Sequence, residues 1–427
     1  MRSTVRTIAA GAGALALMLG VAACGDDKKD DSSGKSGGNG DVVTSEPLKL
    51  GYVLPESGSL SYLGPPQIEA MKYAIKQINE AGGVLGKDLP DAVGGDEADD
   101  AAVAAQSADR VLSEDVDAII GAAASGMSLA IIDKITGANV VECSGSNTAP
   151  TFTDYEDNGY YIRTAPSDAL QGPVLADVVT GDGYSNVAIV GRADDYGKGL
   201  ANATASALEN AGATVALNET YDPKATNFDA IVQKVVAAKP DAVVVVAFEE
   251  GKQIIKGLIE AGLSPAKGTG FYGADGLRSE DLANLVDANN PGVLNGMKGT
   301  APASSDNANF IKELKAFAPK LKETQFAPQV FDCVNVVALA AQAAGSTDPT
   351  KFKDELNGVT EGGEKCTSFK DCKALLDDGK DIDYDGMSGA LDFTDVGEPG
   401  TASIEVYGYN KSGKLETLDT RQAEPVE

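Results

Sequence analysis

The sequence contains no histidine and no tryptophan, and it is poor in positive charge, with 35 Lys and Arg residues against 64 Asp and Glu. Without histidine, the chain cannot build Ser-His-Asp or Cys-His catalytic groups or the usual histidine-containing zinc sites. It also lacks a Walker A phosphate-binding loop. These absences disfavour an enzyme, and we expect neither a cofactor nor a metal.

The shortage of basic residues gives the chain a formal net charge of −29. Proteins that bind nucleic acids are basic, so this charge argues against nucleic acid as a partner. The sequence also offers no polybasic patch for anionic lipids. The acidic balance chiefly indicates a soluble surface and does not identify a partner.

The first 23 residues have the layout of an export signal. Arg2 and Arg6 precede an apolar run over residues 8–23, which is short for a bilayer span. The run stops at "VAAC", which resembles the lipobox of bacterial lipoproteins, where the cysteine is lipidated and becomes the first mature residue. We therefore predict a signal peptide over residues 1–23 and a lipid anchor on Cys24. A spanning anchor with a chance cysteine is the alternative.

Residues 24–46 combine this cysteine with Gly, Ser, Asp and Lys and almost no apolar side chains. Such a segment cannot bury a core, and we expect a disordered tether at the extracytoplasmic face of the bacterial membrane. The remaining residues, 47–427, are too many for one ordinary core and predict two lobes. Loss of the signal peptide, which holds two arginines and no acid, would make the net charge −31.

Five cysteines would enter an oxidising compartment on export. If Cys24 is lipidated, an even number remains. Cys366 and Cys372 are close enough in the chain to pair locally, whereas Cys143 and Cys333 would have to meet in the tertiary fold. Buried free thiols are the alternative.

Short apolar stretches alternate with amphipathic ones along most of the chain. The stretch after "LKLGYVLP" has Ile68, Met71, Ile75 and Ile78 at helical spacing and ends at glycines 82–83. "VDAIIGA" and "DAVVVVAF" are typical of strands buried on both faces. Apolar strands between helices predict parallel sheets and an α/β fold. Near the end, "ALDFTDVGEPGTASIEVYGYNKSGKL" indicates strands joined by turns.

Ligands of open parallel sheets bind at the carboxyl ends of the strands. Two predicted strand-to-helix loops, "AAASGMS" (122–128) and "CSGSNTAP" (143–150), carry small hydroxyl residues beside Gly or Ala. Such residues at a helix start form an anion cradle that suits a carboxylate. Ser and Thr are also ordinary helix caps, which is the commoner role.

Six stretches, in order between residues 47 and 418, carry a family resemblance. They are "GYVLPESGSLSYLGPPQIEAMKYAIKQINEAGGVLGKDL", "IIGAAASG", "CSGSNTAPTFT", "YIRTAPSDALQGPVLA", "GRADDYGKGLA" and "DYDGMSGALDF". Together they resemble the branched-chain amino-acid-binding lipoproteins of ABC importers, which have the type I periplasmic-binding-protein fold. The resemblance implies a solute-binding protein and not an enzyme.

The fold of this family implies two Rossmann-like lobes with parallel sheets, joined by three crossovers and closing by a hinge around the ligand. The crossovers would fall near residues 164–167, near Gly299 and near Asp385. Lobe one would then comprise residues 47–165 and 300–385, and lobe two residues 166–299 and 386–427. This division places the two distant cysteines, Cys143 and Cys333, in one lobe.

The resemblance also implies a binding site for an amino-acid zwitterion. The carboxylate cradle falls on Ser125, Ser146 and Thr148, the ammonium partner on Asp275, and the side-chain pocket on Leu63, Tyr196 and Phe248. The alternative for Asp275 is a turn residue before glycine. Glu249 and Glu250 would shift the preference toward polar or basic ligands if either pointed inward.

From this resemblance we expect a monomer that binds leucine, isoleucine or valine and delivers it to the permease of an ABC importer, with the lipid anchor as its membrane contact. A sensor of the same fold acting with a signalling partner is one alternative. A calcium-dependent surface protein is another, because residues 381–392 fit the ligand spacing of an EF-hand loop with Asp in the last position.

Overall fold

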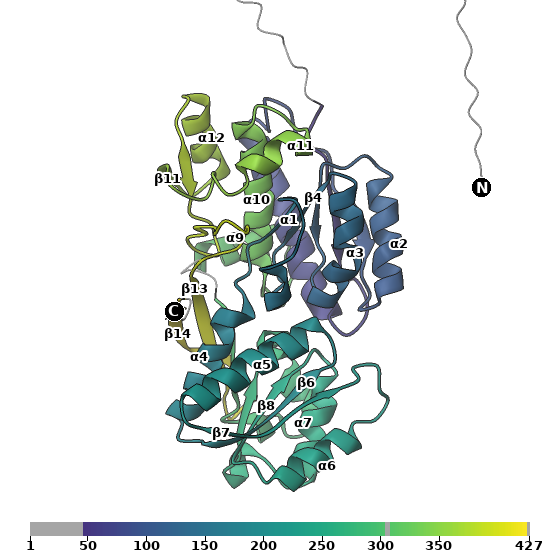
Figure 1. Ribbon diagram of the computed structural model, residues 1–427, viewed down its shortest axis with the longest axis vertical. Helices are drawn as coiled ribbons and strands as arrows, with labels where there is room; N and C mark the ends of the chain where they lie inside the picture. The colour runs from purple at the N-terminus through teal and green to yellow at the C-terminus, as the bar shows by residue number, and fades with distance from the viewer. Residues whose placement is uncertain (1–45, 304–307, 425–427) are drawn as a thin grey trace, which may run out of the picture. The chain divides into compact units, whose positions relative to one another are not determined.

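A computed structural model describes residues 46–303 and 308–424. The predicted signal peptide, the lipidation site Cys24 and the tether up to residue 45 lie outside the described residues. In the described part, the strands form two large sheets and one small one, and helices cover both faces of each large sheet (Figure 1). None of the helices in this part has the length and apolar character that a bilayer span needs.

The first large sheet has five parallel strands in the order β2-β1-β3-β4-β5. Its strands are β1 (Leu50–Leu54), β2 (Val93–Asp96), β3 (Ala118–Gly121), β4 (Val141–Ser144) and β5 (Tyr161–Arg163). The helices packed on it are α1 (Gly64–Glu80), α2 (Ala101–Leu112), α3 (Ser125–Gly137) and α10 (Ala327–Ala343), with α9 (Ala308–Phe317) beside α1. We call this part lobe one.

Neighbouring residues of β3 show why its sequence is apolar throughout. Ile120 packs in a core with α1 and α10, whereas Ile119 packs on the opposite face in a core with α2 and α3. Figure 1 shows these two helix pairs on opposite sides of the sheet. Because both faces are buried, the strand reads as a continuous apolar run, as the sequence predicted.

The second large sheet has seven strands in the order β14-β13-β10-β9-β8-β6-β7. Its strands are β6 (Asn186–Arg192), β7 (Thr214–Tyr221), β8 (Ala242–Val246), β9 (Gly270–Gly273), β10 (Lys298–Pro302), β13 (Ala402–Tyr409) and β14 (Leu415–Ala423). Its helices are α4 (Asp168–Gly181), α5 (Asp195–Asn210), α6 (Asp229–Ala238), α7 (Gly251–Glu260) and α8 (Leu282–Val286). We call this part lobe two. The first five strands run parallel, and β13 and β14 form an antiparallel hairpin at one edge, in agreement with the predicted strands and turns.

The chain passes between the two sheets three times. The first passage follows β5 and leads into α4, at residues 164–167, where the sequence placed a crossover. Gly299, the second predicted position, lies inside β10, which continues to Pro302 before the chain returns to lobe one. After the third position, Asp385, the chain still contributes Phe393 to the core of lobe one, and it joins the second sheet at β13.

Two disulfides join parts of lobe one, and both predicted pairings are confirmed. Cys143 of β4 is bonded to Cys333 of α10, with Cα atoms 5.8 Å apart. Cys366 is bonded to Cys372 with Cα atoms 5.3 Å apart. The second bond joins the small parallel sheet of β11 (Glu364–Cys366) and β12 (Ile382–Tyr384) to α12 (Phe369–Asp377), which follows the short helix α11 (Pro349–Phe352).

The segment with EF-hand spacing begins with a strand. Its residues 382–384 form β12, and the side chains of Asp383 and Asp385 pair with Lys365 at 3.1 and 3.0 Å. The following turn packs on Asp332, whose carboxylate accepts bonds from Tyr384 and Ser388. Within residues 46–303 and 308–424, no three acidic or cysteine side chains gather as metal ligands.

Candidate functional site

A small cavity lies between the two lobes, at the carboxyl ends of strands from both large sheets. Loops after β1, β3 and β4 line it from lobe one, and loops after β6, β8 and β9 line it from lobe two. The lining residues are Leu60, Leu63, Ala123, Ala124, Ser125, Ser146, Tyr196, Phe248, Asp275, Gly276 and Phe326. Six of the seven predicted site residues are among them, and Thr148 is the exception.

Ser125 is the first residue of α3 and faces the cavity from lobe one. Its Oγ accepts a hydrogen bond from the backbone N–H of Ala149 at 3.3 Å. The hydroxyl can therefore direct its own hydrogen toward a ligand oxygen. The free N–H groups at the start of a helix carry partial positive charge, so this edge of the cavity favours an anion.

Glu97 holds the residues just before α3. Its buried carboxylate accepts bonds from the backbone N–H groups of Ala123 at 2.6 Å and Ala124 at 3.1 Å. Burial raises the pKa of Glu97 to about 8, against the lowering effect of these two bonds. Sequence analysis did not single out this residue, because a Glu after a short strand is an ordinary pattern.

Ser146 and Thr148 follow β4 and differ in their surroundings. The Ser146 hydroxyl lies 3.0 Å from Oε1 of Gln67 and 3.2 Å from the carbonyl oxygen of Ala123, so it donates to one of these acceptors. The Thr148 hydroxyl lies 3.0 Å from Oδ2 of Asp168, at the start of α4, and is fully buried. In this arrangement the Thr148 hydroxyl bonds to a residue of lobe two, and Thr148 is not among the residues that line the cavity.

Asp275 faces the cavity from lobe two and is 3% exposed. Its Oδ1 accepts bonds from Nε2 of Gln171 at 2.8 Å and from the Tyr196 hydroxyl at 2.9 Å. Burial raises the pKa of Asp275 above the ordinary value of 3.8, against the effect of these bonds. Burial, followed by the charge of Asp275, also raises the pKa of Asp168 well above its ordinary value.

The turn that carries Asp275 is held by the C-terminal hairpin. Tyr407 of β13 donates its hydroxyl hydrogen to the carbonyl of Ala274 at 2.9 Å. A Cβ atom at Gly273 would lie 2.6 Å from this hydroxyl, and one at Gly299 would lie 2.3 Å from the tyrosine ring. These two positions therefore need glycine so that the ring can pack beneath the site.

Aromatic and aliphatic side chains form the rest of the wall. The rings of Tyr196 and Phe248 stack with centroids 5.2 Å apart, and Leu63 faces the cavity from lobe one. Leu60 and Phe326 also line the cavity but were not predicted. Leu60 lies in a loop that follows a predicted strand, whereas nothing in the pattern around Phe326 pointed to a site.

Neither of the glutamates after Phe248 is among the residues that line the cavity. Oε1 of Glu250 accepts bonds from Arg192 at 3.1 Å and from the Tyr221 hydroxyl at 2.8 Å. Glu249 is partly exposed and forms an ion pair with Lys252. The cavity therefore combines one carboxylate, small hydroxyl groups and an apolar wall.

Two lobes with parallel sheets that enclose a small cavity with one carboxylate, small hydroxyl groups and an apolar wall are suited to binding a small solute. The family profile described as "Periplasmic binding protein" matches residues 47–393. The chain belongs to this family, and within it to the type I proteins of the branched-chain amino-acid group, as the sequence resemblance predicted. Its relatives are solute-binding proteins, so the chain is not an enzyme.

Two curated relatives cover most of the chain. A substrate-binding protein of a chemotactic signal transduction system from Halobacterium salinarum is 27% identical over 388 residues, which are 86% of this chain and 91% of the relative. A leucine-, isoleucine-, valine-, threonine- and alanine-binding protein from Pseudomonas aeruginosa is 27% identical over 326 residues, which are 74% of this chain and 84% of the relative.

Solved structures share the fold. A leucine-binding protein from Thermotoga maritima superposes with a TM-score of 0.73 at 21% identity, covering 88% of this chain and 99% of its own. A branched-chain amino-acid transporter substrate-binding protein from Streptococcus pneumoniae, in complex with isoleucine, gives 0.71 at 24% identity, covering 88% and 100%. These similarities confirm the predicted α/β fold.

Proposed function

We propose that the protein captures a free aliphatic L-amino acid, such as leucine, isoleucine or valine, between its two lobes and delivers it to an ABC importer. Support comes from a relative that binds leucine, isoleucine, valine, threonine and alanine, and from a transporter substrate-binding protein that was solved in complex with isoleucine.

One observation carries this proposal: the buried carboxylate of Asp275 and the start of α3 at Ser125 belong to opposite lobes and line the same cavity. A zwitterion needs both an anion cradle and a counter-charge for its ammonium group. In the proposed complex, Ser125 and the first N–H groups of α3 bind the ligand carboxylate, while Asp275 and the Ser146 carbonyl bind the ammonium group. The ligand side chain contacts Leu63, Tyr196 and Phe248.

Thr148 joins the carboxylate cradle in this proposal only if its hydroxyl hydrogen is released from Asp168. A protonated Asp168 could donate to the Thr148 oxygen, and Thr148 could then donate to the ligand. The raised pKa of Asp168 is consistent with such a protonated state.

We also propose that the protein is exported and anchored through a lipid on Cys24, with residues 25–46 as a tether and the folded part acting as a monomer. The support is the sequence layout of the leader and the presence of two disulfides, which form in oxidising compartments.

A sensor role is the second candidate, because the relative from Halobacterium salinarum is named as part of a chemotactic signal transduction system. Both roles use the same ligand site and differ in the membrane partner. Cross-linking of the ligand-loaded full chain in membranes, followed by identification of the partner, would separate a permease from a signalling receptor.

The test of the ligand is calorimetry of the full chain with free amino acids, their des-amino analogues and benzoate, which a structural neighbour binds. We expect binding of aliphatic amino acids, and we expect Asp275→Asn to weaken it about ten- to a hundredfold because a charge-assisted bond is lost. The control is Asp177→Asn, which makes the same change at an exposed position on α4. This variant should bind amino acids with the affinity of the unmodified chain. If the des-amino analogues bind as tightly as the amino acids, the zwitterion model is wrong.

A further inference from the structure

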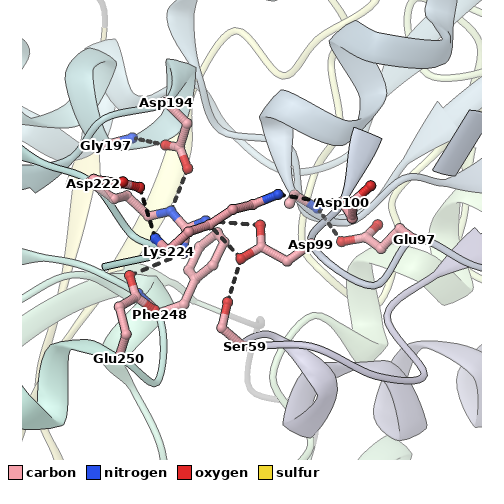
Figure 2. Close-up of polar contacts among 12 residues, drawn as sticks. Ser59, Glu97, Asp99, Asp100, Asp194, Gly197, Asp222, Lys224, Phe248 and Glu250 are labelled. Atoms are coloured by element: carbon pink, nitrogen blue, oxygen red, sulfur yellow. Dashed lines mark hydrogen bonds and ion pairs between the residues drawn. The ribbon is translucent and has the colours of Figure 1, made fainter. Parts of the chain in front are cut away.

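A buried arginine connects the two lobes beside the cavity. Arg192 ends β6 in lobe two and is 1% exposed. Its guanidinium group contacts Asp194 and Glu250 within lobe two, and its Nη2 lies 2.9 and 3.0 Å from the two carboxylate oxygens of Asp99 in lobe one. Figure 2 shows the three carboxylates converging beside the ring of Phe248.

The same guanidinium group packs on Phe248, one of the residues that line the cavity. Its central carbon lies 3.6 Å from the ring centroid of Phe248, in the arrangement of a cation–π contact. Phe248 stacks on Tyr196, and the Tyr196 hydroxyl bonds to Asp275. A continuous series of contacts therefore leads from Asp99 in one lobe to the proposed ammonium partner in the other.

The backbone at Asp99 is held in an unfavourable conformation. Ala98 and Asp99 have φ angles of 53° and 51°, a left-handed region that costs free energy for residues with a side chain. The Ser59 hydroxyl donates to Oδ2 of Asp99 at 2.5 Å, and Gly58 packs so closely that a Cβ there would lie 2.5 Å from the Ala98 carbonyl oxygen. Strain that is maintained by such contacts is typical of functional positions.

Two further ion pairs cross between the lobes with the same polarity. Lys224 of lobe two lies 3.0 Å from Asp100 of lobe one, and Arg278 of lobe two lies 3.4 Å from Glu323 of lobe one. In all three pairs the acid belongs to lobe one and the base to lobe two.

We propose that Arg192 is a positioning residue for ligand binding: Asp194 and Glu250 hold its guanidinium group against Phe248. Its contact with Asp99 forms as the lobes close. This inference rests on the proposed function, in which the ligand is bound between closing lobes. Asp99 is not among the residues that line the cavity, so the contact stabilises the closed state to the same extent for every ligand.

The test is Asp99→Asn in the full chain, which keeps the shape of the side chain and removes its charge. We expect affinity for every bound amino acid to fall by the same factor, roughly tenfold, with faster dissociation and an unchanged ranking of ligands. Arg192→Lys keeps the charge but loses the flat guanidinium face, so it should also change the ranking. The control is Asp109→Asn, which breaks an ion pair with Lys134 inside lobe one and should leave binding unchanged.

Small-angle X-ray scattering provides a readout that needs no ligand. Ligand-free Asp99→Asn should give a more extended scattering profile than the unmodified chain, because the closed state loses a contact. If the unmodified chain binds no amino acid, the proposed function fails and the scattering comparison alone decides the role of the pair. Equal affinities in calorimetry, or identical scattering profiles if no ligand binds, would overturn the inference.

Discussion

At the scale of a residue, the protonation of Asp275 controls how well the cavity can hold an ammonium group. The carboxyl group is buried, which raises its pKa above the ordinary value, and it bonds to Gln171 and Tyr196. Only the ionised form supplies the charge that an ammonium ligand needs. A raised pKa means that this charge is lost at a higher pH than for an exposed aspartate.

We therefore expect amino-acid affinity to fall as the pH is lowered from about 7 to 5, as Asp275 takes up a proton. Calorimetry at a series of pH values would measure this. Asp275→Asn has no proton to gain at this position, so its weaker affinity should vary less over the same range. A full pH dependence in this variant would assign the titration to another group, with Asp168 the nearest candidate.

Glu97 predicts a pH dependence of stability. Its pKa in the folded chain is about 8, against 4.5 in the reference state, so folding takes up a proton between these values. The free energy of unfolding should therefore fall as the pH rises from about 5 to 8, with a slope of up to about 1.4 kcal/mol per pH unit from this group. Urea denaturation of Glu97→Gln over this range should show a smaller slope. Equal slopes in both chains would mean that Glu97 stays ionised against the N–H groups before α3.

At the scale of an element, the sequence predicted helices and strands well where local rules apply. Helix α1 was expected from its apolar spacing and from glycines 82–83, and both glycines have positive φ angles just after its end. The N–H of Gly83 bonds back to the carbonyl of Ile78 at 2.9 Å, a common helix end. The spacing and the two glycines together placed these bounds to within a few residues.

The sequence pattern could not predict contacts between elements that are far apart in the chain. Arg192 and Asp99 are 93 residues apart, and neither residue type nor spacing indicates that they pair. Phe326 lines the cavity, and its backbone has a left-handed conformation with φ of 61°, which is rare for a residue with a side chain. The lining residues that were predicted came from motifs of a known family, whereas these depend on how the lobes meet.

The disulfide between β4 and α10 should contribute to stability and not to binding. It joins two residues of lobe one that are 190 positions apart in the sequence. Because it closes such a long loop, its loss should lower the free energy of unfolding by about 2 to 5 kcal/mol. Denaturation of the Cys143→Ala/Cys333→Ala chain would measure this. The Cys366→Ala/Cys372→Ala chain, with a separation of 6 residues, should lose less. A large loss of ligand affinity in the first variant would contradict the assignment of both cysteines to one rigid lobe.

At the scale of the whole molecule, we expect the leader to provide attachment to the membrane and the folded part to bind the ligand. We predict that Cys24→Ala shifts the protein from the membrane fraction to the soluble fraction, because the proposed lipid attachment site is lost. Cell fractionation followed by immunoblotting would measure the change. The Cys366→Ala/Cys372→Ala chain is a suitable control, since it removes cysteines elsewhere and leaves no unpaired partner of that disulfide. A Cys24→Ala protein that stays in the membrane with its leader uncleaved would favour a spanning anchor.

The support of the binding turn by Tyr407 has a consequence for how the molecule is made. The turn at Asp275 rests on a strand that is synthesised more than a hundred residues later, because Tyr407 belongs to β13. Until that strand emerges and pairs with β10, the Ala274 carbonyl lacks its bonding partner and the space left by glycines 273 and 299 is unfilled. A nascent chain should therefore gain ligand affinity only at the end of its synthesis.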